Sequence, residues 1–98
     1  MKITKSLNGT NLNIALEGRL DTTTAPQLEE ELKAALPGVA ALTWDMSSLA
    51  YLSSAGLRVL LAAQKQMNKQ GSMKVTNVNE TIMDIFEVTG FVDVLTIE

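Results

Sequence analysis

The sequence predicts a single α/β domain, in which helices pack on a mixed β-sheet that begins with an N-terminal hairpin. Three observations predict this fold class. Two segments near the start alternate apolar and polar residues, three later segments carry apolar residues at helical spacing, and short apolar segments separate those helices. A chain of 98 residues is too short to form two halves that each bury a core, so we expect residues 1–98 to form one domain.

The two alternating segments, 2–7 and 11–17, are predicted to be the strands of the hairpin. In the second segment the apolar residues recur at every other position, as they do in a half-buried strand. Asn8-Gly9 lies between the segments, and this dipeptide suits the positive backbone angles of a tight hairpin turn.

A helix is predicted to follow Asp21 and to end at Pro37-Gly38. Thr24 and Gln27 have the spacing of a capping box, in which two side chains of the first turn pair with free backbone amides. The expected inner face of this helix consists of Leu28, Leu32, Ala35 and Leu36.

The second half of the chain is predicted to contain, in order, a strand over 40–46, a helix over 54–70, a strand over 73–78, a helix over 79–89 and a strand over 92–97. Gly71 and Gly90 are expected to end the two helices, and Asn79 to cap the second of them. Strands separated by a helix run parallel through a right-handed crossover, so the whole sheet should be mixed.

The composition excludes several classes of chemistry. The chain contains no cysteine and no histidine, so it can form neither a disulfide, a thiol nucleophile, a thiolate or imidazole zinc site nor a serine–histidine–aspartate triad. The net charge of −3 argues against a nucleic acid as partner, because nucleic acids bind to concentrated positive charge. The polar N-terminus is not a signal peptide and no apolar run approaches the ~20 residues that span a bilayer, so we expect a cytoplasmic protein without direct membrane insertion.

The sequence contains no recognised catalytic or phosphate-binding motif. The glycines do not have dinucleotide-loop spacing, no Gly-Lys-Ser/Thr loop is present, and Ser54 lacks the flanking glycine of a hydrolase elbow. The aspartates that could serve as acids or bases are scattered along the chain as Asp21, Asp45, Asp84 and Asp93. We therefore expect a protein that is not an enzyme, with no catalytic residue, no cofactor and no metal.

Four small residues in a row, Ser53, Ser54, Ala55 and Gly56, lie where the second helix is predicted to start. The first amides of a helix have no partner within the helix and carry partial positive charge, so they would stabilise a phosphate on a capping serine. Gly56 weakens a helix by about 1 kcal/mol relative to alanine, which suits a place where another molecule approaches the backbone closely. The residues alone are consistent with an ordinary helix cap and with a phosphorylation or anion site.

The outer face of the same predicted helix carries a stripe formed by Arg58, Ala62, Lys65 and Lys69, at spacings of four, three and four. This stripe is a local positive patch on an acidic protein. It is either a solvated helix face or a docking surface beside Ser54 for an acidic partner.

Three segments carry a family resemblance. The first is Gly18 to Asp21 leading into Thr24 to Glu29, the second is Asp45 to Leu61 with its centre Tyr51-Leu52-Ser53-Ser54-Ala55-Gly56-Leu57, and the third is Ile85 to Phe91. Together they resemble a stand-alone STAS domain of the anti-sigma factor antagonist type, in the order of the family and over nearly the whole chain. The serine-rich segment is the most specific of the three.

The resemblance implies a mechanism in which the antagonist binds a serine-protein kinase that doubles as an anti-sigma factor. The kinase phosphorylates a serine at the start of the second helix and so releases the antagonist, and a metal-dependent phosphatase restores the active form. That serine falls by position on Ser54, with Ser53 as the alternative. The chain departs from a common family pattern on both sides, with Ser53 where an aspartate often precedes the acceptor and Ala55 where a second serine often follows.

The expected partner surface consists of Asp21, Ser53, Ser54, Ala55, Gly56, Arg58, Ala62 and Lys65. We expect phosphorylation to act by local charge and volume, without refolding. Two other functions stay open from the sequence: a STAS subunit of a membrane transport complex, and a module that senses a small ligand or a nucleotide.

Overall fold

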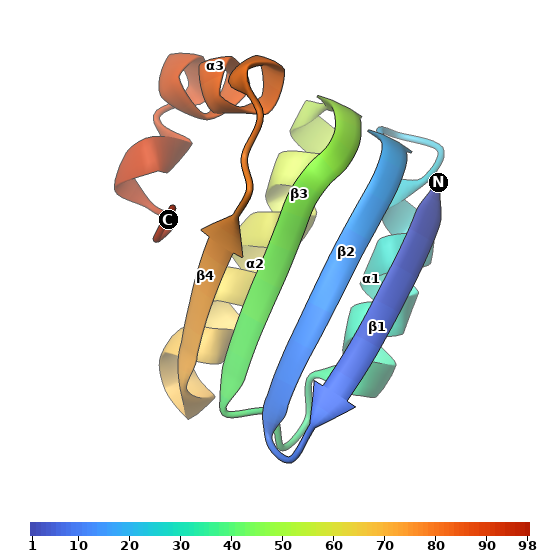
Figure 1. Cartoon of the computed structure of the whole chain (residues 1–98), viewed down its shortest axis with the longest axis vertical. Helices are drawn as coiled ribbons and strands as arrows, with labels where there is room; N and C mark the ends of the chain where they lie inside the picture. Colours follow the sequence, from blue (N-terminus) through green and yellow to red (C-terminus); the bar gives the residue numbers. More distant parts are fainter.

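The computed structural model describes all residues, 1–98, as a four-stranded sheet with three α-helices and one short 3₁₀-helix (Figure 1). In chain order the elements are β1 (Lys2–Asn8), β2 (Asn11–Leu20), α1 (Ala25–Ala35), β3 (Ala41–Leu52), α2 (Ser54–Gln70), β4 (Ser72–Thr76), α3 (Glu80–Thr89) and η1 (Phe91–Asp93). The predicted fold class, a mixed sheet with an N-terminal hairpin and helices packed on it, is confirmed.

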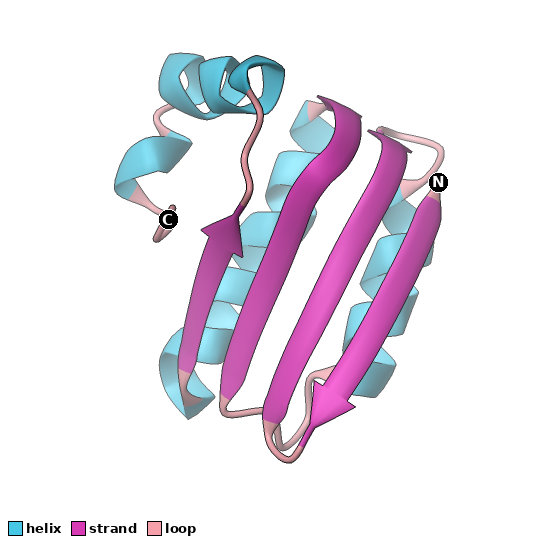
Figure 2. Ribbon diagram, viewed as in Figure 1, coloured by secondary structure: helices cyan, strands magenta, loops and turns pink.

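The strands lie in the order β1-β2-β3-β4, with β1 antiparallel to β2 and the other two neighbours parallel. The hairpin turns at Gly9 and Thr10, and Gly9 has a φ of 64°, a conformation that glycine adopts without steric cost. The two helices α1 and α2 are the crossovers between parallel strands, so both lie on the same face of the sheet (Figure 2).

The core is a cluster of 24 buried apolar residues, most of them from the sheet, α1 and α2, and it extends to Ile82 and Phe86 of α3. It contains the predicted inner residues Leu28, Leu32 and Leu36 of the first helix, together with Trp44 of β3, which is fully buried. No helix of this structure is both long enough and apolar enough to cross a lipid bilayer.

The observed strand β3 extends six residues beyond the C-terminal end of the strand predicted over 40–46, because it continues to Leu52. Irregular pairing with β2 explains the difference. Ala15 and Glu17 of β2 lie opposite Asp45 and Ser48, so that two steps along β2 match three along β3. Such a bulge moves the buried side chains out of strict alternation, and the periodicity by which a strand is recognised is lost.

The prediction of a strand over 92–97 is wrong. Residues Phe91–Asp93 form η1, and only Ile97 pairs with the sheet, through a single bridge to Val75. Gly90 adopts a left-handed conformation with φ 80° and turns the chain straight into the 3₁₀-helix, which leaves Val92 and Val94 exposed instead of alternating into the core.

The predicted capping box of Thr24 and Gln27 is also wrong, because Thr24 makes no side-chain cap on α1. Its hydroxyl donates to the carbonyl of Arg19 at 2.8 Å instead. The Asp21 carboxylate accepts from the backbone amides of Thr23 and Thr24, at 3.0 and 3.2 Å, and so organises the turn that precedes the helix.

Candidate functional site

The N-terminus of α2 is held against the ends of two parallel strands. The backbone amide of Ser53 donates to the carbonyl of Leu20 at 2.9 Å, which ties the turn after β3 to the end of β2. Ser53 has an extended backbone and is the N-cap of α2, where its hydroxyl accepts from the amide of Gly56 at a long 3.5 Å. The ordinary cap expected in this segment is therefore Ser53.

Ser54 is the first residue of α2 and is exposed, whereas Ser53 is only partly exposed. The hydroxyl of Ser54 does not cap the helix, because the hydroxyl of Ser53 performs that role. The structure thus separates the two adjacent hydroxyls into one that organises the helix and one that is presented to solvent beside the free amides of the first turn.

The expectation that Gly56 leaves the backbone open to another molecule is corrected by the structure. Gly56 is buried, and a Cβ placed on it would lie 2.7 Å from Cγ of Leu20 and 2.7 Å from Cδ1 of Leu52. Glycine is required here because the first turn of α2 packs directly on the two strands, and the face of Gly56 is already occupied from within the protein.

A polar cluster at the same end of the sheet was not predicted from the sequence. The guanidinium of Arg19 lies 4.3 Å from the centre of the Tyr51 ring, and its Nε lies 3.7 Å from the Asp21 carboxylate. Arg19 and Tyr51 are paired across β2 and β3. Only the register of these strands, with its bulges, brings the two side chains together, so no local pattern could have identified them.

The pKa of Asp21 is held below its ordinary value of 3.8. The main cause is the hydrogen bond that the Thr23 hydroxyl donates to this carboxylate at 2.7 Å; partial burial acts in the opposite direction, and the backbone amides of Thr23 and Thr24 add to the lowering. Asp21 is therefore ionised and committed to its own turn, with one oxygen directed toward Arg19.

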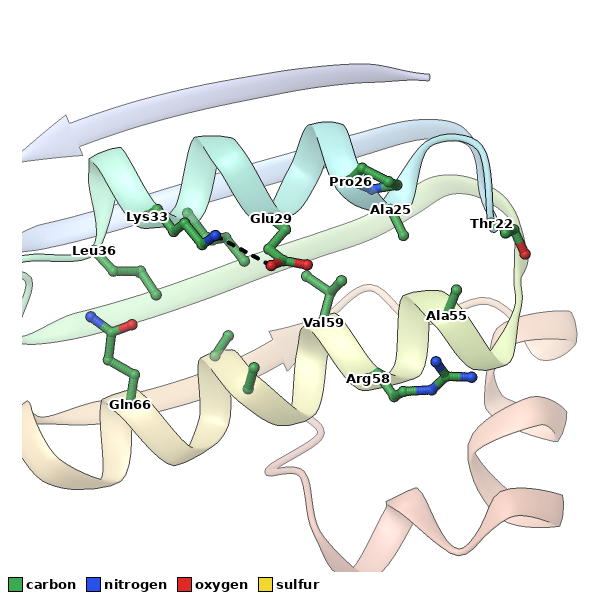
Figure 3. Close-up of a pocket in the computed structure, with 13 residues that line it drawn as sticks. Thr22, Ala25, Pro26, Glu29, Lys33, Leu36, Ala55, Arg58, Val59 and Gln66 are labelled. Atoms are coloured by element: carbon green, nitrogen blue, oxygen red, sulfur yellow. Dashed lines mark ion pairs between the residues drawn. The ribbon is translucent and has the colours of Figure 1, made fainter.

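A groove of about 430 Å³ runs between α1 and α2 (Figure 3). Three residues of the expected partner surface line it, namely Ala55, Arg58 and Ala62. The sequence did not indicate the facing wall, which α1 supplies with Pro26, Glu29 and others. On the α2 side Val59 and Ala63 are buried whereas Ala62 is exposed, and the space above them depends on how far apart the two helices lie.

The charges around the groove are unevenly distributed. The helix α2 contains three basic residues and no acidic one. These three residues, Arg58, Lys65 and Lys69, form no ion pair within the chain. The four ion pairs of the structure involve Lys5, Arg19, Lys33 and Lys74 instead. Glu29 and Lys33, on the facing wall, are paired with each other at 3.5 Å. No carboxylate therefore forms an ion pair with the basic residues of the predicted positive stripe.

The structure brings most of the expected site residues together at one end of α2. Asp21, Ser53 and Ser54 lie near the strand ends, and Ala55, Arg58 and Ala62 continue from there along the groove. Lys65 lies farther along the exposed face and does not line the groove. No three of the carboxylates form a group that could hold a metal ion.

Comparisons with known proteins identify the family. The family model described as "Mlab, STAS domain" matches residues 3–96. BtrV of Bordetella bronchiseptica is 34% identical over 96 residues, which cover 96% of this chain and 83% of BtrV. The anti-sigma-B factor antagonist of Bacillus subtilis is 31% identical over 91 residues, which cover 92% of this chain and 84% of that protein.

Solved structures share the fold. The anti-sigma factor antagonist SpoIIAA in its unphosphorylated form matches with a TM-score of 0.85 and 18% identity, over 99% of this chain and 88% of SpoIIAA. SpoIIAA of Bacillus in the phosphorylated form matches with a TM-score of 0.77 and 18% identity, over 99% of this chain and 91% of SpoIIAA. The family match over nearly all residues, together with this fold, shows that the chain belongs to the STAS domain family.

Proposed function

We propose that this protein is an anti-sigma factor antagonist, a regulatory binding module that is controlled by reversible phosphorylation of Ser54. In the unphosphorylated form it binds an anti-sigma factor that is also a serine-protein kinase, and in the phosphorylated form it is released. Two observations on relatives support the proposal: the Bacillus subtilis relative is named an anti-sigma-B factor antagonist, and SpoIIAA has been solved with and without phosphate.

The observation that carries the proposal is the division of work between Ser53 and Ser54. A kinase has to place the acceptor hydroxyl in its own active site, so the acceptor must be exposed and free of structural duties. Ser54 meets this requirement at the first position of α2, while the Ser53 hydroxyl accepts a hydrogen bond from the helix. Ser54 is therefore the preferred acceptor, and Ser53 is the alternative.

The chemistry requires nothing catalytic from this chain. The kinase transfers the γ-phosphoryl group of ATP to Oγ of Ser54, so that an oxygen–phosphorus bond forms at the serine while the bond to ADP breaks. The hydroxyl proton leaves to a base of the kinase. A metal-dependent phosphatase reverses the modification with water as the attacking group and inorganic phosphate as the product. All three proteins are expected in the cytoplasm.

The phosphate adds about −1.5 to −2 charges at the N-terminus of α2. The free domain accommodates it, because the unpaired amides of the first turn favour an anion. A partner that packs closely over Ser54 instead meets a bulky and hydrated dianion. A penalty of ~3 kcal/mol is sufficient to weaken binding about a hundredfold. The switch therefore needs no refolding of the domain.

The partner surface is proposed to extend from the strand ends into the groove between α1 and α2. It comprises the residues expected from the sequence, with the exception that Gly56 contributes only through its position in the packed turn. Exposed apolar walls beside uncompensated cations fit a partner segment that carries an apolar side chain flanked by acidic residues.

The experiment that tests the proposal combines mass spectrometry with binding measurements. The purified protein is incubated with ATP and each serine kinase of this type from the same organism, and the modified residue is mapped. Phosphate is expected on Ser54, and Ser54→Ala is expected to stay bound to the kinase while Ser54→Asp binds at least about tenfold more weakly. The matched control is Ser53→Ala, which should still be phosphorylated.

Two results would contradict the proposal. The first is the absence of phosphate from Ser54 and Ser53 with every such kinase. The second is the same affinity for Ser54→Asp and the wild type. Stable co-purification with a membrane transporter, or stabilisation by a nucleotide in a thermal-shift screen, would replace it with one of the other two functions.

A further inference from the structure

We propose that Arg58 is the internal counter-ion of the phosphate on Ser54, and that phosphorylation in this way withdraws the cation that Arg58 otherwise offers to the partner at the mouth of the groove. This inference rests on the proposed function and concerns the regulation of the same site. Among the basic residues of α2, only Arg58 lies within four positions of Ser54.

The spacing of the two residues places them on one face of the helix. Ser54 and Arg58 are four positions apart in α2, and residues at this spacing are neighbours on the helix surface. Side chains in a helix lean toward its N-terminus, so the long Arg58 side chain extends back over the turn that contains Ser54. Figure 3 shows Arg58 directed toward the first turn of α2, where Ala55 lies. The order is also the favourable one, because the anion precedes the cation.

The guanidinium of Arg58 is available for such a contact. Arg58 is exposed and forms no ion pair, while Arg19, the other arginine of the chain, lies beside Asp21 and the Tyr51 ring. An arginine can bind a phosphate through two parallel hydrogen bonds, which a lysine cannot do. A free arginine one turn after an exposed acceptor serine therefore has the geometry to bind its phosphate.

The other charged groups near Arg58 do not compete for it. Across the groove on α1, Glu29 is paired with Lys33. On the turn before α1, Asp21 lies against Arg19. The nearest other charge on α2 is Lys65, which has the same sign as Arg58. The acidic residues of α3, which are Glu80, Asp84 and Glu87, form no ion pair with Arg58.

The same guanidinium lines the groove together with Ala55 and Ala62. Before phosphorylation this guanidinium, four positions after Ser54 in α2, forms no ion pair within the chain, and an acidic side chain of the partner can pair with it. After phosphorylation the covalently attached phosphate competes for it at a high effective concentration, since both groups belong to one helical turn. Phosphorylation thus changes the charge of the groove mouth as well as the volume at Ser54.

The test uses protein in which phosphoserine is installed at position 54 during synthesis, so that no kinase is needed. The second pKa of the phosphate, ordinarily about 6, is measured by ³¹P NMR in the wild type and in Arg58→Gln. Pairing with Arg58 favours the dianion, so the phosphate pKa is expected to be lower in the wild type by about half a pH unit. Arg58→Lys should restore part of this shift, because it keeps the charge but not the two parallel hydrogen bonds.

The matched control is Lys69→Gln, which removes one exposed positive charge from the far end of the same helix. It should leave the phosphate pKa unchanged, and the helix amides contribute equally in every variant. Circular dichroism verifies that each variant is folded. Equal phosphate pKa values in the wild type and Arg58→Gln would overturn the inference. This outcome is independent of the proposed function, which fails instead when Ser54 is never phosphorylated or when phosphorylation leaves binding unchanged.

Discussion

Gly56 of α2 lies so close to Leu20 of β2 that a Cβ on the glycine would stand 2.7 Å from Cγ of the leucine. Leu52, at the end of β3, lies equally close to the same position. This contact brings the first turn of α2 down onto the ends of two neighbouring strands. Ser53 and Ser54 lie three and two residues before Gly56, so their orientation depends on how this turn packs.

Gly56→Ala is expected to destabilise the protein by about 1 kcal/mol. Overpacking of a tight core costs about 1–3 kcal/mol, and the better helix propensity of alanine offsets about 1 kcal/mol of that. Leu20 and Leu52 are buried and cannot move aside easily. Urea denaturation measures the change, and Lys65→Ala, at an exposed position of the same helix, serves as the control with a shift below ~0.5 kcal/mol. A more stable Gly56→Ala variant would show that the helix does not pack this tightly.

Ser53→Ala and Ser54→Ala are expected to separate stability from regulation. The first removes the N-cap of α2 and should cost about 0.5–1 kcal/mol, at the low end for a cap because the hydrogen bond to Gly56 is long. The second changes an exposed first-turn residue and should alter the free energy of unfolding by less than ~0.5 kcal/mol while removing the proposed phosphate acceptor. Thermal and urea unfolding of the two variants, measured side by side, give the answer. Equal losses would mean that both hydroxyls cap the helix.

The lowered pKa of Asp21 predicts a specific acid sensitivity. The folded pKa lies below the ordinary value of 3.8, so the stabilisation from this carboxylate is complete above that pH and is lost as the pH falls through the folded pKa. As the pH is lowered below about 4, the melting temperature of Asp21→Asn should therefore fall less than that of the wild type. Thermal unfolding curves recorded across a pH series measure this difference.

The hydroxyl of Thr23 is the main cause of this shift and can be removed by itself. Thr23→Val keeps the backbone amide that also donates to Asp21, but lacks the hydroxyl. The pKa of Asp21, followed by NMR of its carboxyl carbon, is expected to rise toward 3.8 in this variant. An unchanged value would assign the shift to the backbone amides instead.

Ala62→Leu is expected to weaken binding of the anti-sigma partner about tenfold or more by filling the groove between α1 and α2. Ala62 is exposed, so the stability of the protein should change by less than ~0.5 kcal/mol. Asn68→Leu is the matched control, because it adds an apolar side chain to an exposed position of the same helix outside the groove without removing a charge. Isothermal titration calorimetry compares the two. Equal affinities for both variants and the wild type would remove the groove from the partner surface.

Local patterns were sufficient wherever a residue acts through its immediate neighbours. Asn79 caps α3 as predicted, with its side chain accepting from the amide of Ile82, and Gly90 ends that helix in a left-handed conformation. They failed where a distant segment decides. The capping role expected of Thr24 is replaced by a bond to the carbonyl of Arg19 on β2, and the last strand is reduced to the bridge between Ile97 and Val75.

The candidate site shows the same division. The serine-rich segment, the positive stripe and their place at the start of a helix follow from the order of residues along the chain. Two other features do not follow from this order. The cation–π contact of Arg19 with Tyr51 depends on strand register, and the wall of the groove formed by α1 depends on the distance between the two helices.

The sequence by itself determined the mixed sheet, the three helices and the position of the serine-rich segment, since periodicity, caps and turn residues are local properties of the chain. Only the tertiary structure decided that Ser53 caps the helix while Ser54 is exposed, and that Gly56 serves internal packing. The physical reason is that α2 is seated on β2 and β3 through Leu20 and Leu52, residues brought together by strand pairing and burial.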